Sequence, residues 1–385
     1  MYIYLDSAAT TKPSKKVIDE VIYGMENYYG NPSSVHKLGI EADKKLDECR
    51  KVLAKTINCS HNEIIFNSGG SEGNNMVFKG LLKEGSHLIT TPFEHSSIKN
   101  TVEALKEKGV KVTYLSLDEN GKIDIDELKE AIRKDTVLVS IMYVNNEIGT
   151  IQDIEAIGKA IKEVSSRAKF HVDAVQGYGK FPIDVKKMNI DILTASGHKI
   201  YGPKGVGFCY LSKGINLVPN IYGGSQELGI RAGTQNLPGI MGLAVASSEI
   251  EKNREEHLEK VKEIKSYMLK KLSEIKDVRI NSPMTDDFSP YILNASFVGA
   301  RGEVLLHTLE ADDIYVSTGS ACTSKSKGGV VGSHVLEAIK LNNKEVESAI
   351  RFSFSPETTK EEIDRTIESL KKGLMFLRRI KRWVN

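Results

Sequence analysis

"FHVDAVQG" (170–177) and "DILTASGHK" (191–199) are short apolar runs, and each ends in polar residues. Similar runs precede them along the chain, at 63–70, 87–95, 111–117 and 136–147. Runs of this length are typical of buried strands, and amphipathic stretches such as "DELKEAIRK" (126–134) have the spacing of helices between them. This alternation predicts an α/β fold, in which a mostly parallel sheet is covered by helices on both faces.

The pattern changes after about residue 250. A long charged stretch with helical spacing runs from 247 to 276, and it reads as a connector between two domains. Shorter strand-like and helical segments follow it. We therefore expect a large domain over 15–252 and a smaller α+β domain formed by 1–14 and 253–385. A mobile cysteine loop at about 317–334 is expected in the smaller domain.

Composition excludes several classes of protein. A formal net charge of +2 over 385 residues is too balanced for a protein that tracks nucleic-acid phosphates. The first residues, "MYIYLDSAATT", lack the basic start of a signal peptide, and no apolar run has the length of a membrane span. The four cysteines are far apart and lack metal-ligand spacing, so we expect free thiols, no metal site and a cytoplasmic protein.

Polar residues gather where the predicted strands end. Because ligands bind outside the carboxyl ends of parallel strands, these side chains are expected to share one rim of the sheet. The candidates on this rim are Ser71, His95, Asn146, Asp173, Gln176, Ser196, His198 and Lys199.

Two of these residues suit pyridoxal phosphate chemistry, although each has a simpler interpretation. Lys199 lies beside His198 among glycines, where a lowered pKa would favour a Schiff base. Taken alone, it is more often a solvated lysine in a turn. Asp173 could pair with a protonated pyridinium nitrogen. Taken alone, it is more often a capping aspartate.

The glycine-rich turn "NSGGSEGNN" (67–75) lies between a strand and a predicted helix. Backbone N–H groups at Gly70 and Ser71 would face an anion at the start of that helix. The chain has neither a Walker motif nor a clean dinucleotide fingerprint, which counts against ATP and NAD. A single phosphate group remains compatible with this turn.

Cys322 lies in "STGSACTSKSKGG" (317–329), among serines, glycines and lysines. A reactive cysteine needs exposure and nearby positive charge, and Lys325 and Lys327 would favour its thiolate. A surface cysteine on a disordered loop is the simpler interpretation. Cys49 and Cys209 are expected to pack in the core, and nothing near Cys59 would activate it.

Together the motifs resemble one family. "YLDSAATT", "GNPSSVHKLG", "SGGSEGNN", "EHSSI", "VNNEIGTIQ", "HVDAVQGYGK", "SGHKIYGPKGVG", "RAGTQN", "STGSACTS" and "IRFS" occur in the order seen in cysteine desulfurases of the nitrogen-fixation and iron–sulfur assembly class. These are fold-type I pyridoxal phosphate enzymes of the class-V aminotransferase family. The resemblance covers nearly the whole chain.

The resemblance implies a role for each matching residue of the cofactor site. Lys199 would link covalently to pyridoxal phosphate, and His95 would stack on its ring and help move protons. Asp173 would hold the ring nitrogen and Gln176 the ring hydroxyl. The phosphate would be bound by Gly70, Ser71, Ser196 and His198.

The resemblance also implies how substrate and partners bind. Asn146 and Arg351 would bind the substrate carboxylate, and Asn146 would also border the cofactor. Cys322 would accept sulfur as a persulfide. Thr234 would reach the phosphate of a neighbouring subunit, so a homodimer is implied. The sulfur would pass to an acceptor protein, for iron–sulfur cluster assembly, tRNA thiolation or another thio-cofactor.

The chain departs from the family pattern at four positions. Ser71 replaces a common threonine, Ser7 a common asparagine, Leu228 a common arginine and Lys340 a common glycine. No catalytic group is lost, but Leu228 affects the expected subunit interface. The sequence thus predicts a desulfurase that converts L-cysteine to L-alanine. The alternatives are a selenocysteine lyase or an aminotransferase on the same scaffold, and a non-catalytic sulfur or metal carrier.

Overall fold

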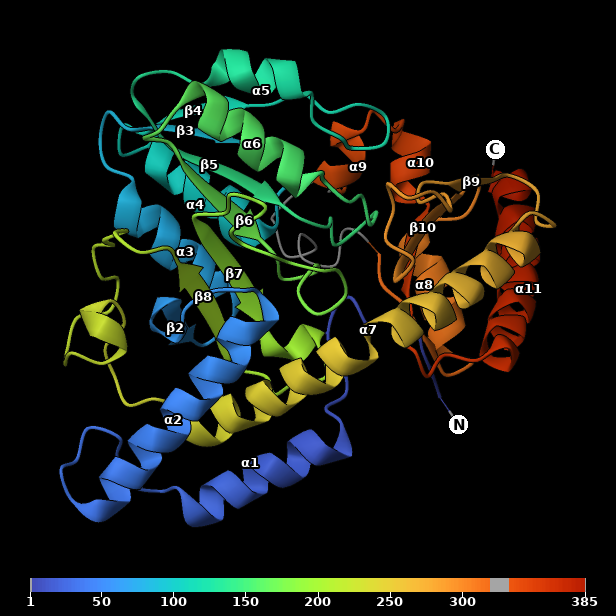
Figure 1. Cartoon of the computed structure of the whole chain (residues 1–385). Helices are drawn as coiled ribbons and strands as arrows, with labels where there is room; N and C mark the ends of the chain where they lie inside the picture. Colours follow the sequence, from blue (N-terminus) through green and yellow to red (C-terminus); the bar gives the residue numbers. More distant parts are fainter. Residues whose placement is uncertain (1, 319–331, 385) are drawn as a thin grey trace.

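The computed structural model describes residues 2–318 and 332–384, so Cys322 lies outside the described residues. A seven-stranded sheet forms the centre of the larger part of the molecule, on the left in Figure 1. Its last five strands in spatial order are parallel, and β8 is antiparallel to both of its neighbours. The mostly parallel sheet is therefore confirmed. The order is β2 (Ile64–Asn67), β8 (Gly207–Leu211), β7 (Ile192–Ser196), β6 (Lys169–Asp173), β5 (Thr136–Met142), β3 (His87–Thr90) and β4 (Lys111–Tyr114).

Helices cover both faces of this sheet, as the sequence predicts. Because successive side chains of a strand point to opposite faces, Ile64 and Phe66 enter one core while Ile65 enters another. The first core is closed by α2 (Lys37–Thr56), α5 (Ile125–Ala131), α6 (Ile154–Val164) and the first half of α7 (Leu237–Leu272). The other core is closed by α3 (Gly70–Leu81) and α4 (Ser96–Lys106), and α1 (Lys15–Asn27) packs against α7.

The long helix α7 begins earlier than the periodicity predicts. The charged stretch indicates a helix from 247, but the helix starts at Leu237, where the Asn236 side chain accepts a hydrogen bond from Gly239 N at 3.2 Å. Its first turns are buried almost all round against the first core, so they lack an amphipathic pattern. Ile250 is its last residue in the first core, and Val261 is its first in a second core.

The second core belongs to the C-terminal part of the chain and to the N-terminal segment. Ile3, Leu5 and Ala8 are buried in it. Its strands are the antiparallel β12 (Ala349–Ser353), β10 (Ile292–Phe297) and β9 (Val278–Ile280), and the parallel pair β1 (Ile3–Tyr4) and β11 (Ile314–Tyr315). Helices α8 (Gly302–Glu310), α9 (His334–Ala338), α10 (Asn343–Glu347) and α11 (Lys360–Val384) belong to the same part of the chain (Figure 1).

Short 3₁₀ helices complete the chain, and one of them sits at the rim of the large sheet. They are η1 (His61–Glu63), η2 (Gly197–Lys199) and η3 (Glu227–Gly229). Within the described residues, no helix is long and apolar enough to cross a membrane. The two cores agree with a division near the middle of α7, but the exact domain bounds stay a prediction.

Candidate active site

Lys199 lies at the end of η2, directly after strand β7. Its Nζ donates hydrogen bonds to two backbone carbonyls, Ala8 O at 2.6 Å and Ala9 O at 2.8 Å. These acceptors come from the N-terminal segment, which runs from the second core to the rim of the large sheet. The amine is thus half-buried at the junction of the two cores and held in a defined position.

Asp173 ends strand β6, beside β7 in the sheet, and only 4% of it is exposed. Its carboxylate accepts hydrogen bonds from Asn74 Nδ2 at 2.9 Å and from Val175 N at 3.0 Å. Both donors are neutral groups. A buried carboxylate with neutral partners can stabilise a cationic ligand placed beside it.

His95 precedes α4 and lies close to both of these residues. Its Nδ1 accepts a hydrogen bond from Ser97 N at 3.1 Å and lies 2.8 Å from Ser97 Oγ. Burial lowers the pKa of His95; the negative charge of Asp173 opposes that shift, and the positive charge of Lys199 adds to it. The structure thus brings His95, Asp173 and Lys199 within electrostatic reach of one another.

Gln176 links the rim to the N-terminal segment. Its Nε2 donates to Ala8 O at 2.8 Å, the same carbonyl that accepts from Lys199. Its Oε1 accepts from Lys180 Nζ at 2.9 Å. Burial, followed by the charges of Lys199 and Arg351, lowers the pKa of Lys180 to about 7. Sequence reasoning missed Lys180, which lies four residues after Gln176 in a turn segment between β6 and β7.

The predicted anion site lies at the start of α3. Gly69 has a φ of +140° there, a conformation that favours glycine, and a Cβ on it would lie 3.2 Å from Ser196 Oγ. Ser71 is exposed in the first turn, next to Gly70. Helix α3 therefore begins beside the end of β7, where its first N–H groups and the Ser71 hydroxyl form the kind of helix start that binds anions.

His198 borders this rim from η2. Its Nδ1 lies 3.2 Å from Thr10 Oγ1, and its backbone carbonyl accepts from Thr11 Oγ1 at 3.0 Å. Burial, and then the charges of Lys199 and other lysines, lower the pKa of His198 to about 4. The imidazole is therefore neutral at neutral pH and binds as a hydrogen-bonding group rather than as a cation.

Arg351 approaches from β12 of the second core. Its Nη1 donates to Asn146 O at 2.8 Å, and its Nη2 pairs with Asp6 Oδ1 at 2.8 Å. Among the described residues, the buried Arg351 Nε and the buried Asn146 Oδ1 have no hydrogen-bond partner. An unpaired buried donor and acceptor at one place are costly without a ligand, so this pair suits a polar substrate group.

The described residues on either side of 319–331 are attached close to Arg351 and Asn146. Ser317 exchanges backbone hydrogen bonds with Arg351 at 3.2 and 2.7 Å. Ser333 Oγ donates a hydrogen bond to the carboxylate of Glu147, a group whose pKa burial raises to about 7. Sequence reasoning also missed Glu147, although it directly follows Asn146.

The remaining predicted residues lie apart from this cluster. Thr234 is exposed between η3 and α7, and no described contact joins it to Lys199 or Asp173. Cys49 and Cys209 are buried, as predicted, and Cys59 is half-buried. Burial raises the pKa of each of these three thiols to about 12, so none is poised as a thiolate. No candidate metal cluster of His, Cys, Asp or Glu occurs in the described part of the chain.

Comparisons with known proteins agree with this geometry. A family model described as "Aminotransferase class-V" matches residues 3–366. "Cysteine desulfurase IscS" of Dictyoglomus turgidum is 41% identical over 383 residues, which cover 98% of this chain and 96% of that protein. The "Cysteine desulfurase, mitochondrial" of Candida albicans is 42% identical over 98% of this chain and 78% of its own.

Solved structures show the same relationship. A "NIFS-LIKE PROTEIN" superposes with a TM-score of 0.91 at 36% identity and covers 98% of this chain and 100% of its own. "SspA in complex with cysteine" superposes with a TM-score of 0.80 at 35% identity over 93% of this chain and 100% of its own. The chain belongs to the class-V aminotransferase family and, within it, to the pyridoxal phosphate-dependent cysteine desulfurases.

Proposed function

We propose that this cysteine desulfurase holds pyridoxal phosphate at the carboxyl rim of the large sheet, linked to Lys199, and passes substrate sulfur to Cys322. The main observation behind the proposal is that Lys199, Asp173 and His95, which follow three different strands, lie close together. An amine, a buried carboxylate and a neutral imidazole form the set that this cofactor needs.

The residues present fit the cofactor. Asp173 offers a buried carboxylate for the ring nitrogen, and Gln176 offers an amide N–H for the ring hydroxyl. The start of α3, with Gly70 and Ser71, offers N–H groups for the phosphate, supported by Ser196 and His198. When bound, pyridoxal phosphate accepts the electron pair left on the substrate Cα.

The chain's own groups orient cysteine and move its protons. Arg351 binds the substrate carboxylate. Asn146 Oδ1, which has no hydrogen-bond partner among the described residues, accepts a hydrogen bond from the bound substrate. Lys199 takes the proton from Cα. His95 is neutral because burial lowers its pKa, so it can accept a proton from the substrate thiol or return one.

Cys322 then receives the sulfur. Its thiolate attacks the substrate Sγ, the Cβ–S bond breaks, and its electron pair stays with the three-carbon fragment, which gains protons and leaves as alanine. The persulfide on Cys322 is then available to an acceptor protein. Ser317 and Ser333, which lie close in sequence to this segment, contact Arg351 and Glu147 on the substrate side, which supports this role.

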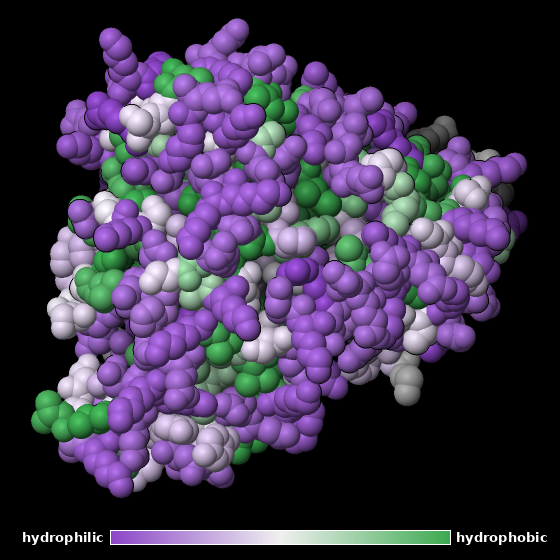
Figure 2. Space-filling view, viewed as in Figure 1, coloured by the Kyte–Doolittle hydropathy of each residue, from purple (hydrophilic) through white to green (hydrophobic). Residues whose placement is uncertain are grey.

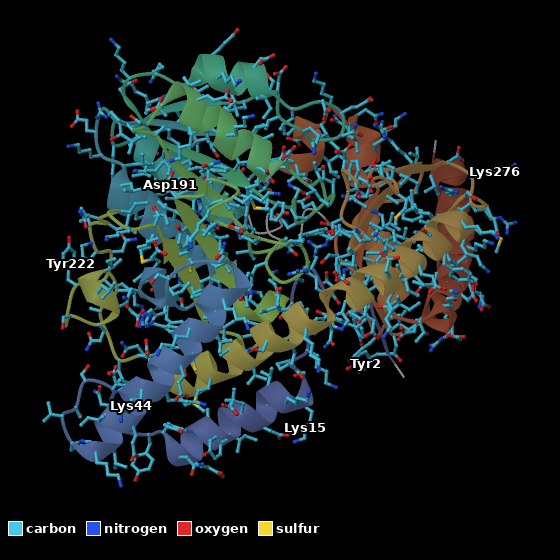
Figure 3. All side chains as sticks on the ribbon, viewed as in Figure 1. Tyr2, Lys15, Lys44, Asp191, Tyr222 and Lys276 are labelled. Atoms are coloured by element: carbon cyan, nitrogen blue, oxygen red, sulfur yellow. The ribbon has the colours of Figure 1, made fainter. Side chains whose placement is uncertain are left out.

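We also infer that the enzyme works as a homodimer in the cytoplasm. The loop between α1 and α2, at the lower left of Figure 1, exposes Tyr29 and Val35. Figure 2 shows hydrophobic residues at the same corner of the surface. Pro32 lines the same pocket as Leu228, and Tyr222 lies on the adjoining outer loop (Figure 3). Exposed Thr234 follows this loop, which supports a role across a subunit interface. The described cysteines are free thiols, as a reducing compartment favours.

Peptide mass spectrometry tests the proposal directly. The purified protein is incubated with L-cysteine without reductant, and a second sample is reduced with borohydride before digestion. We expect one added sulfur on the Cys322 peptide and the reduced cofactor on the Lys199 peptide. A cofactor label on another lysine, or sulfur mainly on Cys59, would contradict the assignment.

A further inference from the structure

A second lysine lies inside the site and takes no part in the steps above. Lys180 is 6% exposed, and its Nζ lies 5.5 Å from the ring centroid of Tyr291. Its Nζ donates a hydrogen bond to Gln176 Oε1 at 2.9 Å. Burying an ammonium costs free energy unless it is paired with an opposite charge and hydrogen-bonded, so the position of Lys180 needs an explanation.

Lys180 belongs to a chain of contacts that ends at Lys199. Lys180 donates to Gln176 Oε1, Gln176 Nε2 donates to Ala8 O, and Lys199 donates to the same carbonyl. The Ala8 contact is shared with the reacting lysine. The hydrogen bond from Lys180 does not involve Lys199. It can therefore hold the Gln176 amide in place after Lys199 breaks its hydrogen bond to Ala8 O in order to react.

We propose that Lys180 is a positioning residue that fixes the Gln176 side chain with its oxygen turned away from Lys199 and its N–H turned toward the cofactor's ring hydroxyl. This inference rests on the proposed function, in which Gln176 contacts that hydroxyl. An amide presents either a donor or an acceptor, and only the donor stabilises a negatively charged ring oxygen. Lys180 therefore determines which of the two the site presents.

The charged groups around Lys180 come from each element packed against it. They are Lys199 on η2 and Arg351 on β12, both cationic, and the Tyr291 phenol, whose raised pKa keeps it neutral. Burial and the two cations lower the pKa of Lys180 to about 7. Among the described residues, the groups that act on Lys180 thus include no carboxylate, which distinguishes this contact from an ordinary buried ion pair.

The test measures the pH midpoint of the visible absorption change of the cofactor-loaded enzyme, which reports protonation at the Lys199 linkage. Lys180→Met should raise this midpoint by roughly half a unit or more, because an unfixed Gln176 no longer stabilises the ring oxygen. Lys265→Met is the matched control. Lys265 is also buried, its pKa is also lowered to about 7, and its Nζ donates a hydrogen bond to Ser289 O, a backbone carbonyl, rather than to a side chain of the site.

A double-mutant cycle separates positioning from simple charge repulsion. If Lys180 acts through Gln176, the double variant Gln176→Ala, Lys180→Met should have the same pH midpoint as Gln176→Ala alone. Additive shifts, or an unchanged midpoint in Lys180→Met, would overturn the proposal. If Lys180→Met does not fold, Lys180→Gln serves instead, because it keeps an N–H donor and should retain the wild-type midpoint. A wild-type enzyme without a linkage at Lys199 would overturn the proposed function itself, and this inference with it.

Discussion

The two sides of the active site are built in different ways. The cofactor side is made from strand ends of one sheet, where Asp173, Ser196 and Lys199 follow directly from β6 and β7. The substrate side is made from segments far apart in the chain, where Arg351 meets Asp6 and the carbonyl of Asn146. The sheet sets the geometry of the cofactor side, whereas the geometry of the substrate side depends on how the two cores pack together.

This difference predicts how each side responds to change. The cofactor side should keep its shape when one of its residues is altered, because neighbouring strands still hold the rest. The substrate side shares its contacts between the N-terminal segment, the loop at 145–150 and β12, so its changes should appear first in substrate binding. The predictions below test this contrast, from the largest expected effect to the smallest.

Lys199→Ala should abolish turnover while the fold survives. Nζ is the covalent attachment point and the base for the Cα proton in our proposal. Its two hydrogen bonds go to the backbone carbonyls of Ala8 and Ala9, so the substitution removes no apolar side chain from either core. Alanine production from L-cysteine and the thermal midpoint are the measurements. Measurable alanine formation, with the cofactor still covalently bound, would show that another lysine does this work.

Cys322→Ser should bind cofactor and cysteine normally and release little or no alanine. A serine hydroxyl is a poor nucleophile toward sulfur, whereas the residues proposed to hold the cofactor lie elsewhere in the chain. Cys59→Ser is the matched control and should retain activity, because burial keeps the Cys59 thiol protonated. Full alanine production by Cys322→Ser would remove Cys322 from the reaction.

Asp173→Asn should slow catalysis by roughly a hundredfold or more, because an amide does not hold the ring nitrogen protonated. The same substitution should leave the substrate KM nearly unchanged, since Asp173 contacts Asn74 and Val175 on the cofactor side. Steady-state kinetics gives both values. A large rise in KM with an unchanged kcat would contradict the division of the site into two sides.

The cofactor side was largely predictable from sequence. Strand ends in parallel sheets meet at one rim, so Asp173, Gln176 and Lys199 could be placed together before any coordinates. Asn74 and Lys180 were missed for a physical reason. Each supports a neighbour through a contact that depends on side-chain direction, which the periodicity of the apolar residues does not encode.

On the substrate side, Asn146 was placed on the rim from its strand end, but Arg351 was predicted only through family resemblance. Asp6 and Arg351 are separated by most of the chain, and no local pattern shows that they form an ion pair. The start of α7 was missed because its fully buried turns have no polar face. Long-range pairing and complete burial are the two situations in which sequence patterns carry little information.

Arg351→Ala should mainly raise the KM for cysteine, by roughly ten- to a hundredfold, the equivalent of about 1.5–3 kcal/mol for a charge-assisted hydrogen bond. Asp6→Asn is its partner experiment. It removes the ion pair but keeps the guanidinium, so its effect on KM should be smaller. An unchanged KM in Arg351→Ala would place the substrate carboxylate elsewhere.

The smallest effect concerns two buried carboxylates, one on each side of the site. Burial raises the pKa of Glu94 to about 8 and that of Glu147 to about 7, from an ordinary value of 4.5. Above pH 4.5 the unfolded chain has released a proton that the folded chain still binds. Each group therefore lowers the free energy of unfolding as the pH rises toward its folded pKa.

Glutamine imitates the protonated acid at every pH, so Glu94→Gln and Glu147→Gln should differ little from wild type near pH 5. Above the folded pKa, each should gain roughly 2–4 °C in Tm, the shift that about 1 kcal/mol gives in a domain of 150–250 residues. The gain should level off near pH 7 for Glu147→Gln and about one unit higher for Glu94→Gln. The reason is that the buried Glu94 Oε2 has no hydrogen-bond partner among residues 2–318 and 332–384, whereas the Glu147 carboxylate accepts a hydrogen bond from Ser333. Thermal melts from pH 5 to 9 measure both curves. If the two curves coincide, the carboxylates on the sheet rim and on the substrate side are buried to the same degree. That result would contradict the proposed difference between the two sides.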